Sequence, residues 1–250
     1  MKTLINQYIN DSMKKPSTLF TTGLLAAVLM TSGQSVFAGA KDDPLLFMVT
    51  IDQLEIRSGD EDPDVLEAQA WLGYDLNKLW IKTEVERVNG TNESAELQLL
   101  YGRAISPFWD VQVGVKRDFD PQPERNWGVV GFQGLSPYYV EIDTALFIGE
   151  SGRSAFRFEA EYELVIAPRL VLIPEVELNF FGQTDLETET GSGLANSEIG
   201  LRLAYEIRRE FAPYIGVNWE AKHGETKRLA RQDGENTEDT QFVVGFKAWF

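Results

Sequence analysis

The chain has 250 residues, of which 43% are hydrophobic and 25% charged, a composition that excludes disorder, collagen and coiled coil. It contains 39 acidic and 23 basic residues, and the net charge of −16 argues against nucleic-acid binding, which needs clustered Lys and Arg. The absence of Cys excludes disulfide scaffolds and cysteine nucleophiles, and a single His disfavours the common His-based catalytic and metal sites. The chemistry therefore rests mainly on carboxylates, and cations are the expected partners.

The first 40 residues have the pattern of a secretory signal peptide. Lys14 and Lys15 precede an apolar run over residues 19–30, and small residues follow up to Ala38-Gly39-Ala40. A membrane anchor is the alternative, but this run is shorter than the roughly 20 residues that a spanning helix needs. We expect residues 1–40 to be a cleaved signal peptide and residues 41–250 to form one domain. Without three basic residues and one acidic residue of the leader, 20 basic and 38 acidic residues remain, a net charge of −18.

Residues after position 40 alternate between apolar and polar side chains with the period of a β-strand. The clearest case is the segment 155–164, in which Arg or Glu separates apolar residues at almost every second position. Eight other segments repeat the pattern: 79–88, 95–103, 109–117, 138–148, 170–181, 198–207, 213–222 and 241–250. Three more, 46–56, 65–75 and 125–134, fit it less cleanly, which gives twelve segments in all. Their lengths suit tilted strands that cross a membrane.

The links between these segments alternate in length. Links after even-numbered segments are short, such as residues 76–78 and 135–137, whereas several odd-numbered segments precede longer polar loops, notably residues 182–193 and 223–240. This alternation is typical of an outer-membrane barrel whose termini share the periplasmic side. Pro174 lies inside a strand segment, where it predicts a local bulge or a change of register.

The sequence therefore predicts an all-β fold, a transmembrane antiparallel β-barrel of about 12 strands that follows the signal peptide and lies in the lipid of the bacterial outer membrane. A secreted β-sandwich would have shorter strands, and an eight-stranded ligand barrel would have fewer. The chain end favours the outer-membrane barrel. Its apolar face consists of Phe242, Val244, Phe246, Ala248 and Phe250, and it resembles the aromatic ending of bacterial outer-membrane barrels.

Charged residues of the strands are expected to face the lumen, because charge toward hydrocarbon costs roughly 2–4 kcal/mol per residue near the midplane. This places Glu159, Glu161 and Glu163 inside, and the next strand adds Glu175 and Glu177. Other inward carboxylates are Glu84, Glu86, Asp110, Glu141, Asp143, Glu198, Glu206 and Glu220, and the expected inward cations are Lys82, Lys116, Arg157 and Arg202. We expect the excess of carboxylates to form a cation path or a weak metal site. The alternative is that salt bridges merely fill a wet interior.

Aromatic residues and strand number give two further expectations. A barrel of twelve strands is expected to enclose a narrow passage, plugged or gated. Residues expected to form the girdles at the membrane interfaces are Trp71, Trp80, Trp109, Trp127, Trp219, Trp249, Tyr138 and Tyr214, since they fall near strand ends.

Long segments of the chain resemble a known family. Residues 191–220 read GSGLANSEIGLRLAYEIRREFAPYIGVNWE, residues 134–147 read GLSPYYVEIDTALF, residues 159–164 read EAEYEL, and residues 169–178 read RLVLIPEVEL. Together they resemble the copper-resistance protein B family over essentially the whole chain after residue 40. The resemblance implies an outer-membrane barrel that binds or moves copper ions, as cargo and not as a catalytic cofactor, beside periplasmic copper-resistance proteins.

The chain departs from the family pattern before its first strand. Many members carry a Met- and His-rich segment there, with the soft ligands that copper(I) prefers, whereas only Lys41-Asp-Asp-Pro44 stands here. The remaining candidate ligands are the five inward carboxylates on residues 159–177, Met48 on the first strand, and His223 at the base of the longest loop.

Two other functions stay open at this point. A structural or adhesive outer-membrane barrel would bind another surface through its loops. An outer-membrane hydrolase would need a nucleophile or an activated water beside His223. Because the Gly-Glu-Thr-Lys sequence after His223 has no catalytic pattern, we expect no enzymatic activity.

Overall fold

A computed structural model describes residues 43–59 and 62–250, so the predicted signal peptide lies outside the described residues. The strands in these ranges are β1 (Leu46–Ser58), β2 (Asp64–Gly73), β3 (Asn77–Val88), β4 (Thr91–Ser106), β5 (Trp109–Asp120), β6 (Arg125–Leu135), β7 (Val140–Gly149), β8 (Ser154–Tyr162), β9 (Leu164–Ala167), β10 (Leu170–Phe181), β11 (Gly193–Tyr205), β12 (Phe211–Lys222) and β13 (Glu238–Trp249). The helical elements are the 3-10 helix η1 (Glu150–Gly152) and the α-helix α2 (Gly224–Asp233).

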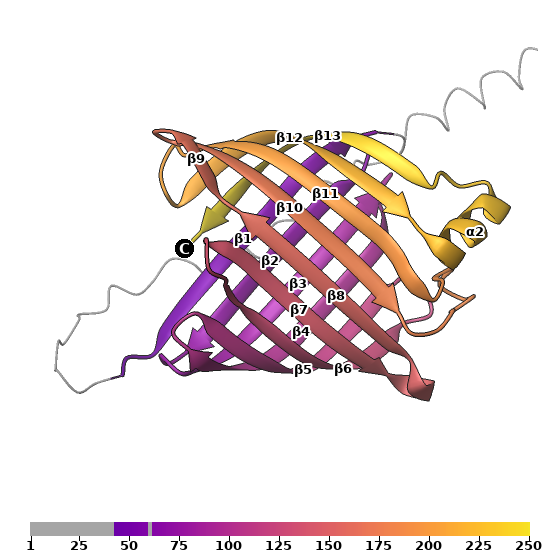
Figure 1. Ribbon diagram of the computed structural model, residues 1–250, viewed down its shortest axis with the longest axis horizontal. Coiled ribbons are helices and arrows are strands. Elements are labelled where there is room, and N and C mark those ends of the chain that lie inside the picture. Colours follow the sequence, from indigo (N-terminus) through magenta and orange to yellow (C-terminus); the bar gives the residue numbers. More distant parts are fainter. Residues whose placement is uncertain (1–42, 60–61) are drawn as a thin grey trace, which may run out of the picture. The chain divides into compact units, whose positions relative to one another are not determined.

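The strands form one closed antiparallel barrel (Figure 1). Neighbours in the chain are neighbours in the wall, and β1 pairs with β13 to close it. At this seam the backbone N–H of Val49 donates to Phe250 (3.1 Å) and the N–H of Phe250 donates to Val49 (2.9 Å). Because β8 and β9 both pair with β10, they share one place, and the wall has twelve places. The predicted barrel of about 12 antiparallel strands is confirmed.

Pro174 interrupts the pairing beside β10 without shifting it. Glu175 lies opposite Glu161 and Leu172 lies opposite Leu164, so the register is the same on both sides of the gap. Proline has no N–H to donate, so the ladder opens here and the neighbouring strand divides into β8 and β9. The bulge or register change that the sequence predicts is therefore not at Pro174 itself, but the pairing of β9 with β10 does shift nearby, between Leu170 and Val171.

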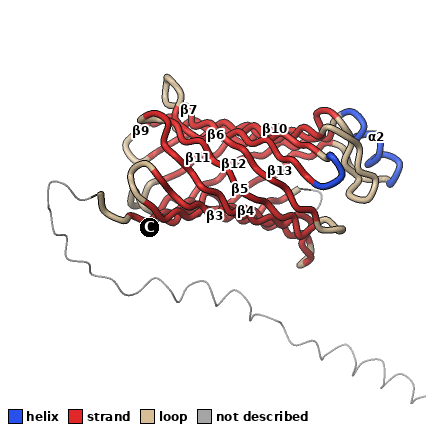
Figure 2. Tube along the Cα trace, turned by 90° about the horizontal axis from the view of Figure 1, so that it is seen from below, coloured by secondary structure: helices blue, strands red, loops and turns tan. Residues whose placement is uncertain are grey.

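Turns and loops gather at opposite ends of the barrel (Figure 2). The links that follow even-numbered places in the wall are short turns. Strand β1 begins and strand β13 ends beside these turns, and we name this end of the barrel the turn end. The loop end carries residues 182–192 and the segment 223–237 with α2. This arrangement agrees with the alternation seen in the sequence, and in outer-membrane barrels the turn end is periplasmic.

Helix α2 stands where the sequence predicts a polar loop. Its Leu229 and Ala230 are buried, and the helix packs against β11. It ends at Gly234, whose φ of 82° is left-handed and favours glycine. Two apolar residues among many charges give little periodic signal, which explains why the helix was missed. Neither helix of the described ranges is long and apolar enough to cross a membrane.

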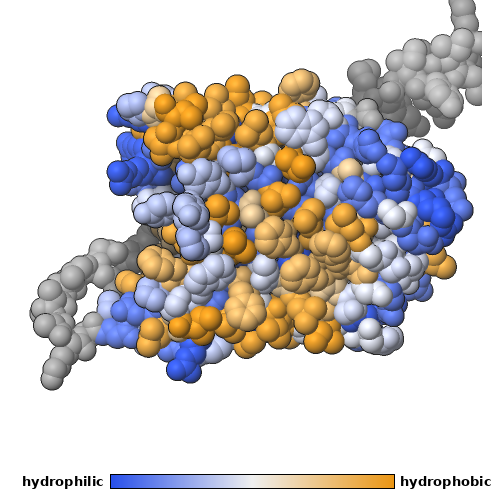
Figure 3. Space-filling view, viewed as in Figure 1, coloured by the Kyte–Doolittle hydropathy of each residue, from blue (hydrophilic) through white to orange (hydrophobic). Residues whose placement is uncertain are grey.

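The barrel has an apolar outside and a largely polar inside. On β13, Phe242 and Val244 are 69% and 63% exposed, whereas Val243 between them is 1% exposed. Figure 3 shows hydrophobic residues over the middle of the visible face and hydrophilic residues at the end that carries α2. Exposed apolar side chains in a continuous band fit contact with lipid hydrocarbon.

Two apolar clusters nevertheless lie inside the barrel. The first contains Trp80, Leu100, Trp127, Val129 and Phe147, with Trp71 packed against it, and the second contains Val171, Ile173, Ala204, Tyr214 and Val243. The expectation that Trp71, Trp80, Trp127 and Tyr214 form interfacial girdles is therefore wrong, because strand alternation turns these residues inward. Trp219 and Trp249 are 40% and 39% exposed, as a girdle requires.

Candidate functional site

Carboxylates of neighbouring strands lie opposite one another inside the barrel. The first acidic row crosses β7, β8, β10, β11, β12 and β13 and consists of Asp143, Glu159, Glu177, Glu198, Glu220 and Asp239. The second acidic row crosses β2 to β5 and consists of Glu67, Glu84, Glu96 and Asp118. Neighbouring strands are about 4.8 Å apart, so adjacent members of a row are close enough to share one cation.

The first acidic row also extends along the barrel axis. Strands of a barrel are tilted, so a row that follows the hydrogen-bonding direction advances along the axis. The row starts at Asp143, in the turn-end half of β7, and finishes at Asp239, the second residue of β13 beside the loop-end segment 223–237. It therefore forms a nearly continuous acidic track through much of the lumen.

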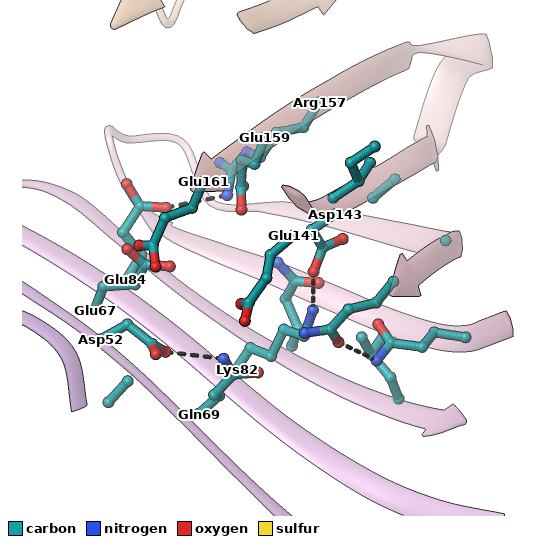
Figure 4. A pocket seen from close by; sticks show the side chains of 18 of the residues that line it. Asp52, Glu67, Gln69, Lys82, Glu84, Glu141, Asp143, Arg157, Glu159 and Glu161 are labelled. Atoms are coloured by element: carbon teal, nitrogen blue, oxygen red, sulfur yellow. Dashed lines mark hydrogen bonds and ion pairs between the residues drawn. The ribbon is translucent and has the colours of Figure 1, made fainter. Parts of the chain in front are cut away.

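A cavity of about 350 Å³, which we name the chamber, lies between the two rows. Figure 4 shows Asp52, Glu67 and Glu84 on one side of it and Glu159 and Glu161 on the other. The charged residues that line it are Asp52, Glu67, Lys82, Glu84, Glu96, Glu141, Asp143, Arg157, Glu159, Glu161, Glu175 and Lys247. Carboxylates outnumber cations in this lining, so the chamber attracts cations and repels anions.

Several cations of the interior reach across the chamber to the opposite wall. The Arg157 guanidinium on β8 contacts Glu84 on β3 and Glu96 on β4, each at 3.0 Å. Lys82 on β3 pairs with Asp143 on β7. These pairs join strands that are not neighbours, so they brace the lumen from within.

A second network is centred on Glu55, whose side chain is fully buried. This carboxylate accepts hydrogen bonds from Arg57 Nε (2.7 Å), Arg202 Nε (3.0 Å) and the Tyr214 hydroxyl (2.8 Å). Arg202 also pairs with Glu175 at 2.5 Å. Glu55 and Arg57 are not among the predicted inward residues, because a bulge between Ile51 and Gln53 interrupts the alternation of β1.

The structure brings four of the five predicted carboxylates together. Glu161 lies opposite Glu175, and Glu159 lies opposite Glu177. Glu163 lies in the break between β8 and β9 at the turn end, and its side chain is 53% exposed.

Each of the five also contacts a cation. The ion pairs are Glu159 and Glu177 with Arg157 (3.8 and 3.6 Å), Glu161 and Glu163 with Lys247 (2.8 and 3.3 Å), and Glu175 with Arg202. Lys247 is not among the predicted inward cations, although its position between the apolar residues Phe246 and Ala248 indicates an inward side chain. The salt-bridged filling left open by the sequence is thus present in the lumen.

Met48 and His223 lie away from these carboxylates. Met48 faces Trp71 across β1 and β2, near the turn end. The Nε2 atom of His223 lies 2.8 Å from Ser197 Oγ. Since Glu198 points inward, Ser197 faces outward, and the contact lies outside the lumen. In residues 43–59 and 62–250, no group of three or more His, Asp or Glu residues has the arrangement of a metal site.

The contact of His223 with Ser197 bears on the hydrolase alternative. A serine nucleophile needs a histidine that a third group orients. Within the described part of the chain, the contact with Ser197 is the one side-chain hydrogen bond of His223. The pair therefore lacks the orienting partner of a catalytic triad.

An ion-pair cluster fastens the loop 182–192 at the loop end. Asp185 pairs with Arg125 at 2.9 Å and with Arg153 at 3.0 Å. Burial raises the pKa of Asp185, but the hydrogen bonds from Arg125 and the Glu187 N–H and the charges of both arginines outweigh it. The pKa of Asp185 therefore lies below its ordinary value of 3.8.

Comparisons with known proteins give the same fold and a family. The family described as copper resistance protein B precursor (CopB) matches residues 45–250. Copper resistance protein B of Escherichia coli is 42% identical over 210 residues, which are 84% of this chain and 71% of that protein. The copper resistance protein B homolog of Pseudomonas syringae pv. tomato (strain ATCC BAA-871 / DC3000) is 42% identical over 184 residues, which are 74% of this chain and 63% of that protein.

A solved structure supports the architecture. The NanC porin superposes with a TM-score of 0.52 and 14% identity, and the match covers 81% of this chain and 99% of the porin. At this identity the likeness concerns the fold alone. The closed barrel with its apolar outer band and the curated relatives together indicate the bacterial outer membrane. The resemblance found in the sequence is confirmed, and the chain belongs to the copper resistance protein B family.

Proposed function

We propose that this barrel binds copper ions in its lumen and passes them across the bacterial outer membrane. The observation that carries the proposal is the first acidic row, which offers carboxylates on six consecutive places of the wall, from the periplasmic half of β7 to the extracellular end of β13. Membership of a copper-resistance family supports copper as the cargo.

The chemistry of the row suits passage better than storage. Carboxylates are hard ligands that hold copper(II) only weakly, and a path conducts when its sites are favourable to enter and weak enough to leave. Arg157 and Lys247 compete with a passing ion for the same oxygens. A cation is therefore attracted into the lumen without being trapped there.

The proposal assigns roles to the candidate ligands. Glu159, Glu161, Glu175 and Glu177 form the inner part of the path, and Glu163 and Met48 stand at its periplasmic end, where Met48 supplies a soft sulfur. His223 belongs to a separate contact outside the lumen. Residues 1–40 act as the signal peptide, residues 41–250 form the exported barrel in outer-membrane lipid, and periplasmic copper-resistance proteins exchange copper with it.

Substitution of the carboxylates tests this function. In proteoliposomes with a trapped copper-sensitive dye, Glu159, Glu177 and Glu220 of the first acidic row, changed together to Gln, should slow the entry of Cu²⁺. A matched control changes Glu124, Glu189 and Glu235 to Gln, which removes the same charge from exposed loop-end positions. Different gel mobility of boiled and unboiled samples shows that both variants assemble.

Two results would contradict the proposal. If the lumen variant assembles and passes copper as fast as the parent, these carboxylates are structural filling, and Met48 and His223 are the next residues to test. If the parent barrel passes no copper at all, the structural or adhesive alternative gains support, and binding assays with shortened loops would address it.

A further inference from the structure

Ion pairs stand at both ends of the chamber. Towards the loop end, Arg157 reaches from β8 to Glu84 on β3 and Glu96 on β4, at 3.0 Å each. Towards the turn end, Lys247 reaches from β13 to Glu161 at 2.8 Å and to Glu163 at 3.3 Å. Both cations line the chamber themselves.

Both sets of pairs span the lumen. In the order of strands around the wall, β4 and β8 stand four places apart, and so do β8 and β13. A side chain that joins such distant strands must cross the interior. Arg157 also lies over the Phe147 ring at 5.9 Å, so the guanidinium rests against the first apolar cluster, which fills part of the same cross-section.

Other oxygen atoms of the chamber remain without partners. Among the described residues, no hydrogen bond or ion pair reaches the side-chain carboxylate of Glu67, which faces the chamber from β2. The side-chain carbonyl oxygen of Gln69, two residues further along, is buried without a hydrogen bond. An entering cation therefore finds oxygen ligands that Arg157 and Lys247 leave unused.

We propose that Arg157 and Lys247 are tethered cations that close the two ends of the chamber and select divalent over monovalent ions. The selection rests on the proposed function, because it concerns the ion that the barrel passes. A side chain held beside its carboxylates acts at a high effective concentration, so a free ion must attract those carboxylates more strongly to displace it. The Coulomb energy of a divalent ion is twice that of K⁺ at the same distance.

Planar-bilayer conductance in KCl tests the closure without copper. The wild-type barrel should conduct K⁺ poorly, and Arg157→Gln or Lys247→Gln alone should change this little, because the other end stays closed. The double variant should conduct about tenfold more, which corresponds to a barrier lower by ~1.4 kcal/mol. Its preference for Cu²⁺ over K⁺, measured from reversal potentials, should fall.

Two variants serve as controls. Lys78→Gln removes a similar inward ion pair, with Asp110 at 3.0 Å, which joins strands only two places apart and does not line the chamber. It should conduct like the wild type. Arg157→Lys keeps the charge and should stay closed in the background of Lys247→Gln. Heat-dependent gel mobility verifies that each variant is assembled.

The inference is overturned if the wild type conducts K⁺ as well as the double variant, or if the assembled double variant stays closed. Failure of the proposed function looks different. If the double variant opens to K⁺ but neither barrel passes copper, the tethered cations are upheld and the copper path is refuted. If the wild type passes copper and the double variant gains no K⁺ conductance, the copper path is upheld and the closure by tethered cations is refuted.

Discussion

Replacement of Glu55 by Gln should destabilise the barrel more than any other single loss of negative charge in the lumen. The Glu55 side chain has no exposed surface, and four donor atoms of three residues converge on it, from Arg57, Arg202 and Tyr214. Gln keeps the shape but removes the charge, and its NH₂ group is a donor that faces other donors. Two buried arginines then lose the carboxylate that they share.

The size of the effect follows from this geometry. Removing one partner of a buried ion pair costs about 3–5 kcal/mol, because the remaining charge stays desolvated. Glu175, which also binds Arg202 at 2.5 Å, and Glu198, which binds Arg57 at 2.8 Å, retain one contact for each arginine. We therefore expect a loss near the lower limit, about 3 kcal/mol.

Urea unfolding of the barrel in lipid vesicles, followed by Trp fluorescence, measures this loss. Glu67→Gln is the matched control, since it makes the same chemical change in a lumen residue that, within the described ranges, has no ion pair. Its free energy of unfolding should stay equal or rise, because mutual repulsion with neighbouring carboxylates is relieved. The reasoning is refuted if Glu55→Gln loses less than about 1 kcal/mol, the worth of an ordinary hydrogen bond, or if both variants lose equally.

Three other substitutions have defined outcomes. Phe250→Asp should lower the amount of assembled barrel in outer-membrane fractions, because it places a charge at the seam where Phe250 pairs with Val49; normal levels would contradict this. Asp185→Asn should make the loop 182–192 sensitive to protease at neutral pH. Because the pKa of Asp185 is lowered, the stabilisation that its charge gives is present above pH 3.8 and is lost only as the pH falls through the lowered pKa. The wild-type loop should therefore resist protease equally at about pH 5 and pH 7. Trp80→Ala should lower the free energy of unfolding by about 3–5 kcal/mol, because it removes a large buried side chain from the first apolar cluster, and a loss near zero in urea unfolding would argue against tight packing there.

The wall of the barrel could be predicted because its signal is local. Each strand that crosses lipid must alternate, so residues 155–164 or 241–250 reveal their two faces without knowledge of their neighbours. The same reasoning gave the inward positions of Glu159, Glu161, Glu175 and Glu177. It failed on β1, where the bulge after Ile51 turns both Asp52 and Gln53 toward the chamber.

The partners inside the lumen could not be predicted in this way. Arg157 meets Glu96 over 61 residues of sequence, and Lys247 meets Glu161 over 86. Which strands face each other across a barrel depends on strand number and stagger together, and neither appears in the alternation of a single strand. The inward Trp residues were misplaced for a related reason, since proximity to a strand end does not say which face a side chain occupies.

The distance from each carboxylate to its paired cation indicates whether that carboxylate stabilises the barrel or can contribute to an ion path. Glu55 binds Arg57 at 2.7 Å and Arg202 at 3.0 Å, so a metal ion would have to break two strong pairs to reach it. Glu159 and Glu177 share one guanidinium at 3.8 and 3.6 Å, beyond ordinary hydrogen-bond distance, and belong to a row of six carboxylates. An entering cation gains the most Coulomb energy at carboxylates whose existing ion pairs are longest. Copper should therefore follow Glu159 and Glu177, with Glu67 opposite, while the Glu55 network stabilises the wall.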